Sequence, residues 1–136
     1  MYEKSFKLEI VTPKKIVFKD KATSLSAPGV QGGFQILHSH APFLATVEIG
    51  ETKMKDSEGR DTIFATSGGF LEVKNNSVVV LVETAERAPE IDVRRAEEAK
   101  DRAIQRLHSK DHDVNLGRAR LAMLRAMNRL RVVVKV

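Results

Sequence analysis

The spacing of apolar residues changes near Pro89, and this change limits the folds that the chain can adopt. Before Pro89, apolar and polar residues alternate, as at Phe6, Leu8 and Ile10, and such a period of two is typical of half-buried β-strands. After Pro89, apolar residues recur every three or four positions, which is the period of an α-helix that packs along one face. We therefore expect a β-rich part followed by a helical part.

Short strand-like segments follow one another through the first half, with turn signals between them. Gly32-Gly33, Gly68-Gly69 and Asn75-Asn76 mark three of these turns, and asparagine tolerates the positive φ angle of a tight hairpin. No helical pattern separates the strands, so we expect antiparallel pairing in a sandwich or barrel of about 85 residues. The expected strands are 6–11, 15–18, 22–27, 34–37, 43–49, 62–67, 70–74 and 77–84.

Two amphipathic helices are expected in the second half, separated by the polar segment 108–113. A short loop between helices places them side by side and antiparallel, as a helical hairpin. Alanine dominates both apolar stripes, and because burial contributes about 25 cal/mol per Å², each alanine stabilises the docking little. We therefore expect a hairpin that docks weakly and can move. The stripes are Val93, Ala96, Ala99, Ala103 and Leu107, then Leu116, Ala119, Met123, Ala126, Met127 and Leu130.

The sequence thus predicts a fold of class β + α with two domains. The first is an N-terminal antiparallel β-sandwich over residues 1–86, and the second is a C-terminal antiparallel two-helix hairpin over residues 87–136. Neither an internal repeat nor a low-complexity segment interrupts this organisation.

The formal net charge of +5 comes entirely from the helical half. Residues 1–85 contain ten basic and ten acidic residues, whereas residues 86–136 contain thirteen basic and eight acidic ones. From Val114 onward, six basic residues occur without any acidic residue. Such a segment favours an anionic partner, and the candidates are nucleotide phosphates, an acidic protein surface, nucleic acid and a membrane surface.

Residues 90–96, Glu-Ile-Asp-Val-Arg-Arg-Ala, form the expected start of the first helix. Asp92 is a typical N-cap, whose carboxylate accepts a backbone N–H from Arg94 or Arg95. Ile91 and Ala96 then occupy the two positions of a hydrophobic staple. Capping explains these residues without any ligand, so local physics alone favours a structural role.

The arginines of the two helices suggest a second interpretation. Arg118, Arg125 and Arg129 are spaced by seven and four residues, so they share one face of the second helix. In a folded hairpin this face can meet the start of the first helix, whose free N–H groups bind anions. Guanidinium groups beside a helix N-terminus would form a phosphate-binding site, while a solvated basic face is the simpler alternative.

Six short motifs occur in a fixed order along nearly the whole chain. They are Val-Thr-Pro (11–13), Ile-Leu with His-Ala-Pro (36–37 and 40–42), Ser-Gly-Gly-Phe-Leu-Glu-Val (67–73), Ala-Glu-Arg-Ala (85–88), Ile-Asp-Val-Arg-Arg-Ala (91–96) and Arg-Ala-Met-Asn-Arg-Leu (125–130). Each motif is weak alone. In this order, over a sandwich followed by a hairpin, the chain strongly resembles the epsilon subunits of bacterial F-type ATP synthases.

This resemblance implies a non-catalytic subunit of the central stalk, which couples the rotor of a proton-translocating ATP synthase to its catalytic head. The sandwich would contact the gamma subunit and the c-ring at the cytoplasmic face of the cell membrane, and membrane association would occur only through the complex. The hairpin, when extended, would inhibit ATP hydrolysis by reaching the beta (and alpha) subunits. The implied inhibitory contacts are Arg118, Arg120, Arg125, Arg129 and Arg131.

In some members of this family the folded hairpin binds ATP through the motif Ile/Leu-Asp-x-x-Arg-Ala, which this chain contains at 91–96. The resemblance therefore implies ATP as a regulatory ligand and no required cofactor. Arginines would bind the phosphates, and Glu86 and Asp92 would bind adenine or ribose groups. The chain has no P-loop, so hydrolysis of the ligand is not expected. The implied ATP-binding residues are Glu86, Ile91, Asp92, Arg95, Ala96, Arg102, Arg125 and Arg129.

The segment 31–40 departs from the family pattern, which resembles Gly-Glu-Leu-Gly-Ile-Leu-Pro-Gly-His. In this chain Gly33 stands where the acidic residue is customary, and His38-Ser39 stands where Pro-Gly is customary. The resemblance implies that this loop faces the c-ring, so its contacts there would differ from the family's. The residues expected to face the rotor are Gly33, Phe34, His38 and His40.

Other functions find weaker support in the sequence. A nucleic-acid-binding module that uses the basic last helix is the main alternative, but that helix lacks aromatic residues and a recognition motif. The pairs His38/His40 and His108/His112 have spacings seen in metal sites, but neither has a third ligand at useful spacing, so no metal site is expected. No nucleophile–base pair indicates an enzyme. The absence of cysteine and of a secretory signal favours a cytoplasmic location.

Overall fold

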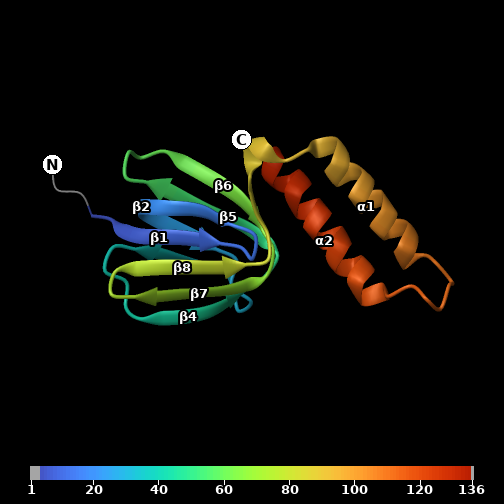
Figure 1. Ribbon diagram of the computed structural model, residues 1–136, viewed down its shortest axis with the longest axis horizontal. Helices are drawn as coiled ribbons and strands as arrows, with labels where there is room; N and C mark the ends of the chain where they lie inside the picture. Colours follow the sequence, from blue (N-terminus) through green and yellow to red (C-terminus); the bar gives the residue numbers. More distant parts are fainter. Residues whose placement is uncertain (1–3, 136) are drawn as a thin grey trace.

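The computed structural model describes residues 4–135, in which a β-sandwich precedes two helices (Figure 1). The predicted fold class, a sandwich followed by a helical hairpin, is confirmed. Residues 1–3 and 136, which the predicted domains include, lie outside the described residues.

Within residues 4–135, nine strands make up the sandwich. They are β1 (Phe6–Val11), β2 (Ile16–Ala27), β3 (Phe34–Leu37), β4 (Phe43–Val47), β5 (Gly50–Asp56), β6 (Asp61–Thr66), β7 (Gly69–Lys74), β8 (Ser77–Val82) and β9 (Ala85–Arg87). Their order is β4-β7-β8-β1-β2-β5-β6-β9, with β3 paired to β2. Neighbouring strands are antiparallel except β1 and β8, which run parallel.

Three features of the strands differ from the prediction. The segments 15–18 and 22–27 belong to one strand, β2, which pairs with β1 along its first part and with β3 and β5 along its second. β5 is missed because Met54 is its only large apolar residue, although Thr52 is also buried. β9 is missed because three residues are too few to show a period.

Alternate residues of the strands point inward and form one apolar core. Phe6, Leu8 and Ile10 of β1 are buried, as their alternation predicts. The core also contains Leu25, Ile36, Phe64, Leu71, Val73, Val78 and Val80.

The β7–β8 hairpin turns at Asn75 and Asn76, whose φ angles are 52° and 57°. This positive φ at two consecutive asparagines confirms the predicted tight turn. The amide of Asn76 also accepts the N–H of Ser39 (2.8 Å) and donates to the carbonyl of Ser5 (2.9 Å). The turn therefore anchors the loop that carries His38 to the sheet.

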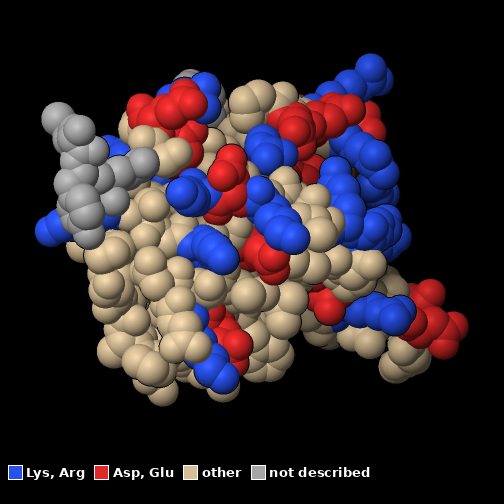
Figure 2. Space-filling model, turned by 60° about the vertical axis from the view of Figure 1, so that its left-hand side comes forward, with Lys and Arg blue, Asp and Glu red and all other residues tan. Residues whose placement is uncertain are grey.

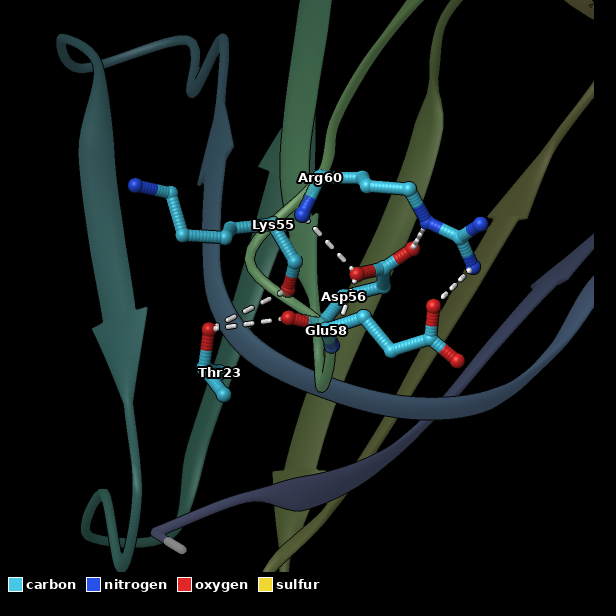
Figure 3. A network of polar contacts seen from close by, with 5 residues as sticks. All are labelled: Thr23, Lys55, Asp56, Glu58 and Arg60. Atoms are coloured by element: carbon cyan, nitrogen blue, oxygen red, sulfur yellow. Dashed lines mark hydrogen bonds and ion pairs between the residues drawn. The ribbon is translucent and has the colours of Figure 1, made fainter.

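The turn between β5 and β6 is held by the carboxylate of Asp56 (Figure 3). Its Oδ1 accepts the backbone N–H groups of Glu58 (2.9 Å) and Arg60 (3.0 Å), and its Oδ2 accepts Nε of Arg60 (3.0 Å). The guanidinium of Arg60 also pairs with Glu58 at 3.1 Å. Hydrogen bonds from Arg60, its backbone N–H first, hold the pKa of Asp56 below the usual 3.8.

We expect the stabilisation supplied by Asp56 to disappear in acid. Because the folded-state pKa is lowered, the stabilisation is present above the unfolded value of 3.8 and is lost as the pH falls through the folded value. Asp56→Asn keeps an acceptor oxygen but removes the charge. It should lower the Tm at neutral pH, and circular dichroism melts should show this difference shrinking below pH 3.8. A difference that does not change with pH would show that the charge contributes nothing.

The helical part begins with a short 3-10 helix, η1 (Ala88–Glu90), followed by α1 (Val93–Leu107) and α2 (Leu116–Val133). The carboxylate of Asp92 accepts the N–H of Arg95 at 3.1 Å, which confirms the predicted N-cap of α1. Asn115 caps α2 in the same way, accepting the N–H of Arg118 at 3.0 Å. The two caps fix where the hairpin's helices start. Neither helix has a stretch apolar enough to cross a membrane.

The helices pack on one another through four buried alanines, Ala96, Ala103, Ala119 and Ala126. Because alanine side chains are small, the two helix backbones lie close together, and the larger residues of the predicted stripes lie at the edges of the contact. Val93, Leu116 and Met127 are therefore exposed, and their prediction as packing residues is wrong.

Candidate functional site

α2 docks on the sandwich at β5, β6 and η1, at the right-hand edge of the sandwich in Figure 1. Val132 is fully buried there, in an apolar cluster with Ala65, Ala88 and Ile91. Two of these residues are alanines, so the apolar contact is small. Polar contacts must therefore contribute to the docked position of the hairpin.

Asn128 makes the central polar contact between α2 and the sandwich. Its side chain is 4% exposed, and its amide nitrogen donates to the carbonyls of Gly50 (2.8 Å) and Thr66 (3.4 Å). Sequence reasoning missed this residue. One feature of the sequence could have identified it. Asn128 precedes Val132 by one helical turn, so both side chains lie on the same face of α2, and Val132 is buried.

Two ion pairs flank this amide. The guanidinium of Arg129 pairs with Glu86 of β9, and the ammonium of Lys135 pairs with Glu51 of β5. Both join the end of the chain to the sandwich, across more than forty residues of sequence. The Arg129–Glu86 pair is half-buried, so solvent screens it less than a fully exposed pair.

A cavity of about 560 Å³ lies where the β1–β2 turn and the segment 83–86 meet the N-terminal part of α1 and the C-terminal part of α2. This cavity, called the hairpin cavity below, brings together six of the eight residues expected to bind ATP. They are Glu86, Asp92, Arg95, Ala96, Arg102 and Arg129.

The other two expected residues lie elsewhere. Ile91 is buried in the apolar cluster with Val132 of α2 and does not line the hairpin cavity. Arg125 lines an adjoining cavity of about 880 Å³ between α2 and the sandwich, together with Leu121 and Leu124. The two cavities share Glu83 and Thr84.

The hairpin cavity is lined by charges of both signs. Three carboxylates are already engaged: Glu86 pairs with Arg129, Glu90 pairs with Arg87 at 3.6 Å, and Asp92 caps α1. Four cations of the lining make no ion pair within 4.0 Å to any residue of the described chain. These cations, Lys14, Lys15, Arg95 and Arg102, are available to an anion.

Three of the arginines expected to reach catalytic subunits, Arg118, Arg120 and Arg131, are exposed on α2. Figure 2 shows Lys and Arg side chains gathered on the right-hand side of its view, with carboxylates between them. Arg125 and Arg129 are instead half-buried against the sandwich. The docked hairpin therefore presents only part of its basic surface.

The loop expected to face the rotor is partly packed on the sandwich. Phe34 meets the ring of Phe43 edge-to-face at 5.1 Å, and the ring of His40 lies 5.6 Å from Phe43. Gly33 is exposed, and His38 and His40 are half-buried. Across residues 4–135, no group of three or more His, Asp or Glu side chains is placed to hold a metal ion.

Both parts of the chain match models of known families. Residues 5–88 match the ATP synthase delta/epsilon chain β-sandwich domain, and residues 90–133 match the ATP synthase delta/epsilon chain long α-helix domain. The ATP synthase epsilon chain of Syntrophomonas wolfei is 44% identical over 131 residues, covering 96% of both chains. The chain belongs to the ATP synthase epsilon-chain family. The epsilon chain of Nitratidesulfovibrio vulgaris is 48% identical over 130 residues, again covering 96% of each.

Solved structures show the same fold as this member of the epsilon-chain family. A chain in the cryo-EM structure of the Euglena gracilis mitochondrial ATP synthase superposes with a TM-score of 0.80 at 17% identity, covering 94% of this chain and 81% of that one. A chain in the Tetrahymena thermophila mitochondrial ATP synthase gives 0.58 at 15% identity, covering 99% and 98%. These two structures show the shared fold alone, whereas the family models and the epsilon-chain relatives confirm the predicted resemblance to epsilon subunits.

Proposed function

We propose that this epsilon-family chain is a non-catalytic subunit of the central stalk of a proton-translocating ATP synthase. The observation that carries this proposal is the match of both domains, over 96% of the chain, to proteins named ATP synthase epsilon chain. In this role the chain couples the rotor to the catalytic head, and it lies at the cytoplasmic face of the membrane only through the complex.

An apolar surface on the sandwich supports assembly with a stalk partner. Leu44 of β4, Phe70 of β7 and Leu81 of β8 are 68%, 55% and 51% exposed on three neighbouring strands. Phe70 and Leu81 stand directly opposite one another in the β7–β8 ladder. Exposed apolar groups that cluster in this way mark a protein interface, and we assign this one to the gamma subunit. The loop carrying Gly33, Phe34, His38 and His40 is proposed to face the c-ring.

The docked hairpin supports a role as a mobile inhibitor. Alanine-rich packing and a few polar contacts hold α2 on the sandwich, so undocking costs little. Undocking exposes Arg125 and Arg129 beside Arg118, Arg120 and Arg131. An extended α2 then exposes all five arginines, which lie on two faces of the helix, to acidic segments of the beta (and alpha) subunits, where it blocks ATP hydrolysis.

The hairpin cavity supports ATP as the ligand that favours the docked state. Arg95 and Arg102 of α1 and Arg129 of α2 border one space, so a phosphate chain bound there joins both helices. Asp92 and Glu86 supply acceptors for adenine or ribose groups, and Arg125 contributes from the adjoining cavity. A ligand that binds only the docked hairpin shifts the population toward it. ATP acts here as a regulator, and no cofactor is required.

Charge reversal on α2 should abolish inhibition without disturbing the docked fold. Arg118, Arg120 and Arg131 are exposed and take part in none of the hydrogen bonds or ion pairs that join α2 to the described residues of the sandwich, so their replacement by glutamate leaves these contacts in place. The full-length variant, added to ATP synthase lacking its epsilon subunit, should leave ATPase activity near the uninhibited level, whereas the wild type suppresses it. The triple variant should repel the acidic segments that the wild type binds.

The matched control reverses three exposed cations of the first helix and its loop, Arg94, Arg106 and Lys110. It changes net charge by the same amount and should inhibit as the wild type does. Equal loss of inhibition in both triple variants would contradict the assignment of the inhibitory surface to α2.

A further inference from the structure

We propose that Lys14 and Lys15 form a phosphate-binding element on the sandwich side of the hairpin cavity and make it selective for nucleoside triphosphates over monophosphates. Both lysines line the cavity, although no motif of the chain points to them. This inference rests on the proposed binding of ATP in the same cavity.

The turn that carries the two lysines has a fixed backbone. The N–H of Thr12 donates to the carbonyl of Lys15 at 2.9 Å, and the N–H of Lys15 donates to Oγ1 of Thr12 at 3.3 Å. The Thr12 hydroxyl also donates to the carbonyl of Lys15 at 3.2 Å. Just beyond the turn, the guanidinium of Arg87 donates to the carbonyl of Val17 at 3.0 Å and ties β2 to β9. The lysines therefore stay beside the cavity, while their long side chains are free to turn toward a ligand.

The two walls of the hairpin cavity carry different charges, and Lys14 and Lys15 are the cations of the sandwich wall. The hairpin wall supplies the arginines Arg95, Arg102 and Arg129, whereas the sandwich wall supplies the carboxylates of Glu83 and Glu86. Without the lysines, the charged side chains of the sandwich wall would all be carboxylates, and this wall would have no cation to bind a polyphosphate. With them, it offers two ammonium groups that make no ion pair within 4.0 Å in the described part of the chain.

The two walls make binding in the cavity depend on the length of the phosphate chain. Arginines of the hairpin and lysines of the sandwich line one cavity, so a triphosphate bound there engages both and bridges the two domains. A monophosphate bound by the arginines leaves the lysines unused. The lysines therefore contribute more to ATP binding than to AMP binding. Because bound ATP contacts both domains, the lysines also increase the stabilisation of the docked hairpin by ATP.

Calorimetric titration of the full-length chain tests this assignment. Lys14→Ala/Lys15→Ala should weaken ATP binding by about three- to tenfold, the range expected for two exposed ion pairs. AMP binding should change by less than about twofold, because these contacts are not made. The matched control, Lys53→Ala/Lys55→Ala, removes the same charge from exposed positions on β5 outside the cavity and should bind ATP as the wild type does.

The charge-retaining variant Lys14→Arg/Lys15→Arg should keep wild-type ATP affinity. If the wild type binds ATP and the alanine double variant binds it equally well, the lysine assignment is overturned while the ATP site stands. Equal losses for ATP and AMP would overturn the selectivity. If the wild type binds no ATP, the proposed ATP function itself fails.

Discussion

Asn128→Asp should release the helical hairpin from the sandwich at neutral pH. The amide nitrogen of Asn128 donates to two backbone carbonyls, those of Gly50 and Thr66. A carboxylate in its place has no hydrogen to donate, and its negative charge would face the same two oxygens in a buried position. Burying an unpaired charge in this way costs on the order of 3 kcal/mol. The small apolar contact around Val132 cannot offset this cost, so the undocked state should dominate.

A distance measurement between the two domains would detect the release. Because the chain contains no cysteine, Lys21→Cys and Arg120→Cys create two specific labelling sites, one on β2 and one on α2. Spin labels at these sites should give one narrow distance distribution in the otherwise unchanged chain. With Asn128→Asp the distribution should shift and broaden at neutral pH.

The matched control makes the same chemical change where it is harmless. Asn115→Asp also converts an amide to a carboxylate, but at the N-cap of α2, where aspartate accepts the N–H of Arg118 equally well. It should leave the distance distribution unchanged.

The carboxyl introduced by Asn128→Asp can donate once protonated, so acid should restore the docking of this variant, since burial favours the neutral form. A narrow distribution for Asn128→Asp at neutral pH would show that the amide does not hold the hairpin.

The parts of the structure that follow from local patterns could be predicted from the sequence. The alternation at Phe6, Leu8 and Ile10 identifies a buried strand, and Asn75-Asn76 identifies a turn with positive φ. Asp92 is recognisable as an N-cap because its spacing to Arg95 is set by helix geometry alone. In each case the partners are neighbours in the sequence.

The parts that join distant segments could not be predicted. β5 is held by pairing with β2 and β6, not by its own apolar pattern. Lys14 and Lys15 belong to the hairpin cavity because the β1–β2 turn lies beside α1 and α2, which no spacing within 11–18 reveals. The positions of these residues depend on pairing between distant strands and on the docking of the hairpin on the sandwich.

Arg125 and Arg129 line different cavities for the same reason, because their surroundings depend on how the hairpin docks on the sandwich. Helical spacing places both residues on one side of α2, so the sequence assigns them to one phosphate site. Their actual surroundings depend on the rotation of α2 about its axis, which Asn128 and Val132 set by docking on the sandwich. In the docked position of α2, Arg129 lines the hairpin cavity, whereas Arg125 lines the adjoining cavity.

Arg129 and Arg125 should therefore differ in how much they contribute to ATP binding. In calorimetric titrations of ATP, Arg129→Ala should weaken binding by at least about tenfold, because a charge-assisted contact to phosphate contributes about 1.5–3 kcal/mol. The loss has a second cause, since removal of Arg129 leaves the carboxylate of Glu86 without its partner at the cavity wall, where it repels phosphate. Arg125 lies on the same helix and is also half-buried, but it lines the adjoining cavity, so Arg125→Ala should weaken binding by less than about threefold.

A charge-retaining variant separates the two causes. Arg129→Lys keeps a cation beside Glu86 but lacks the planar fork that binds two phosphate oxygens at once, so its affinity should lie between those of the wild type and Arg129→Ala. If Arg125→Ala weakens ATP binding as much as Arg129→Ala does, α2 must bind ATP in a different rotation from the docked one. In that event the position of Asn128 would also differ between the free and the ATP-bound chain, and the amide signals of Gly50 and Thr66 in NMR spectra would shift on addition of ATP.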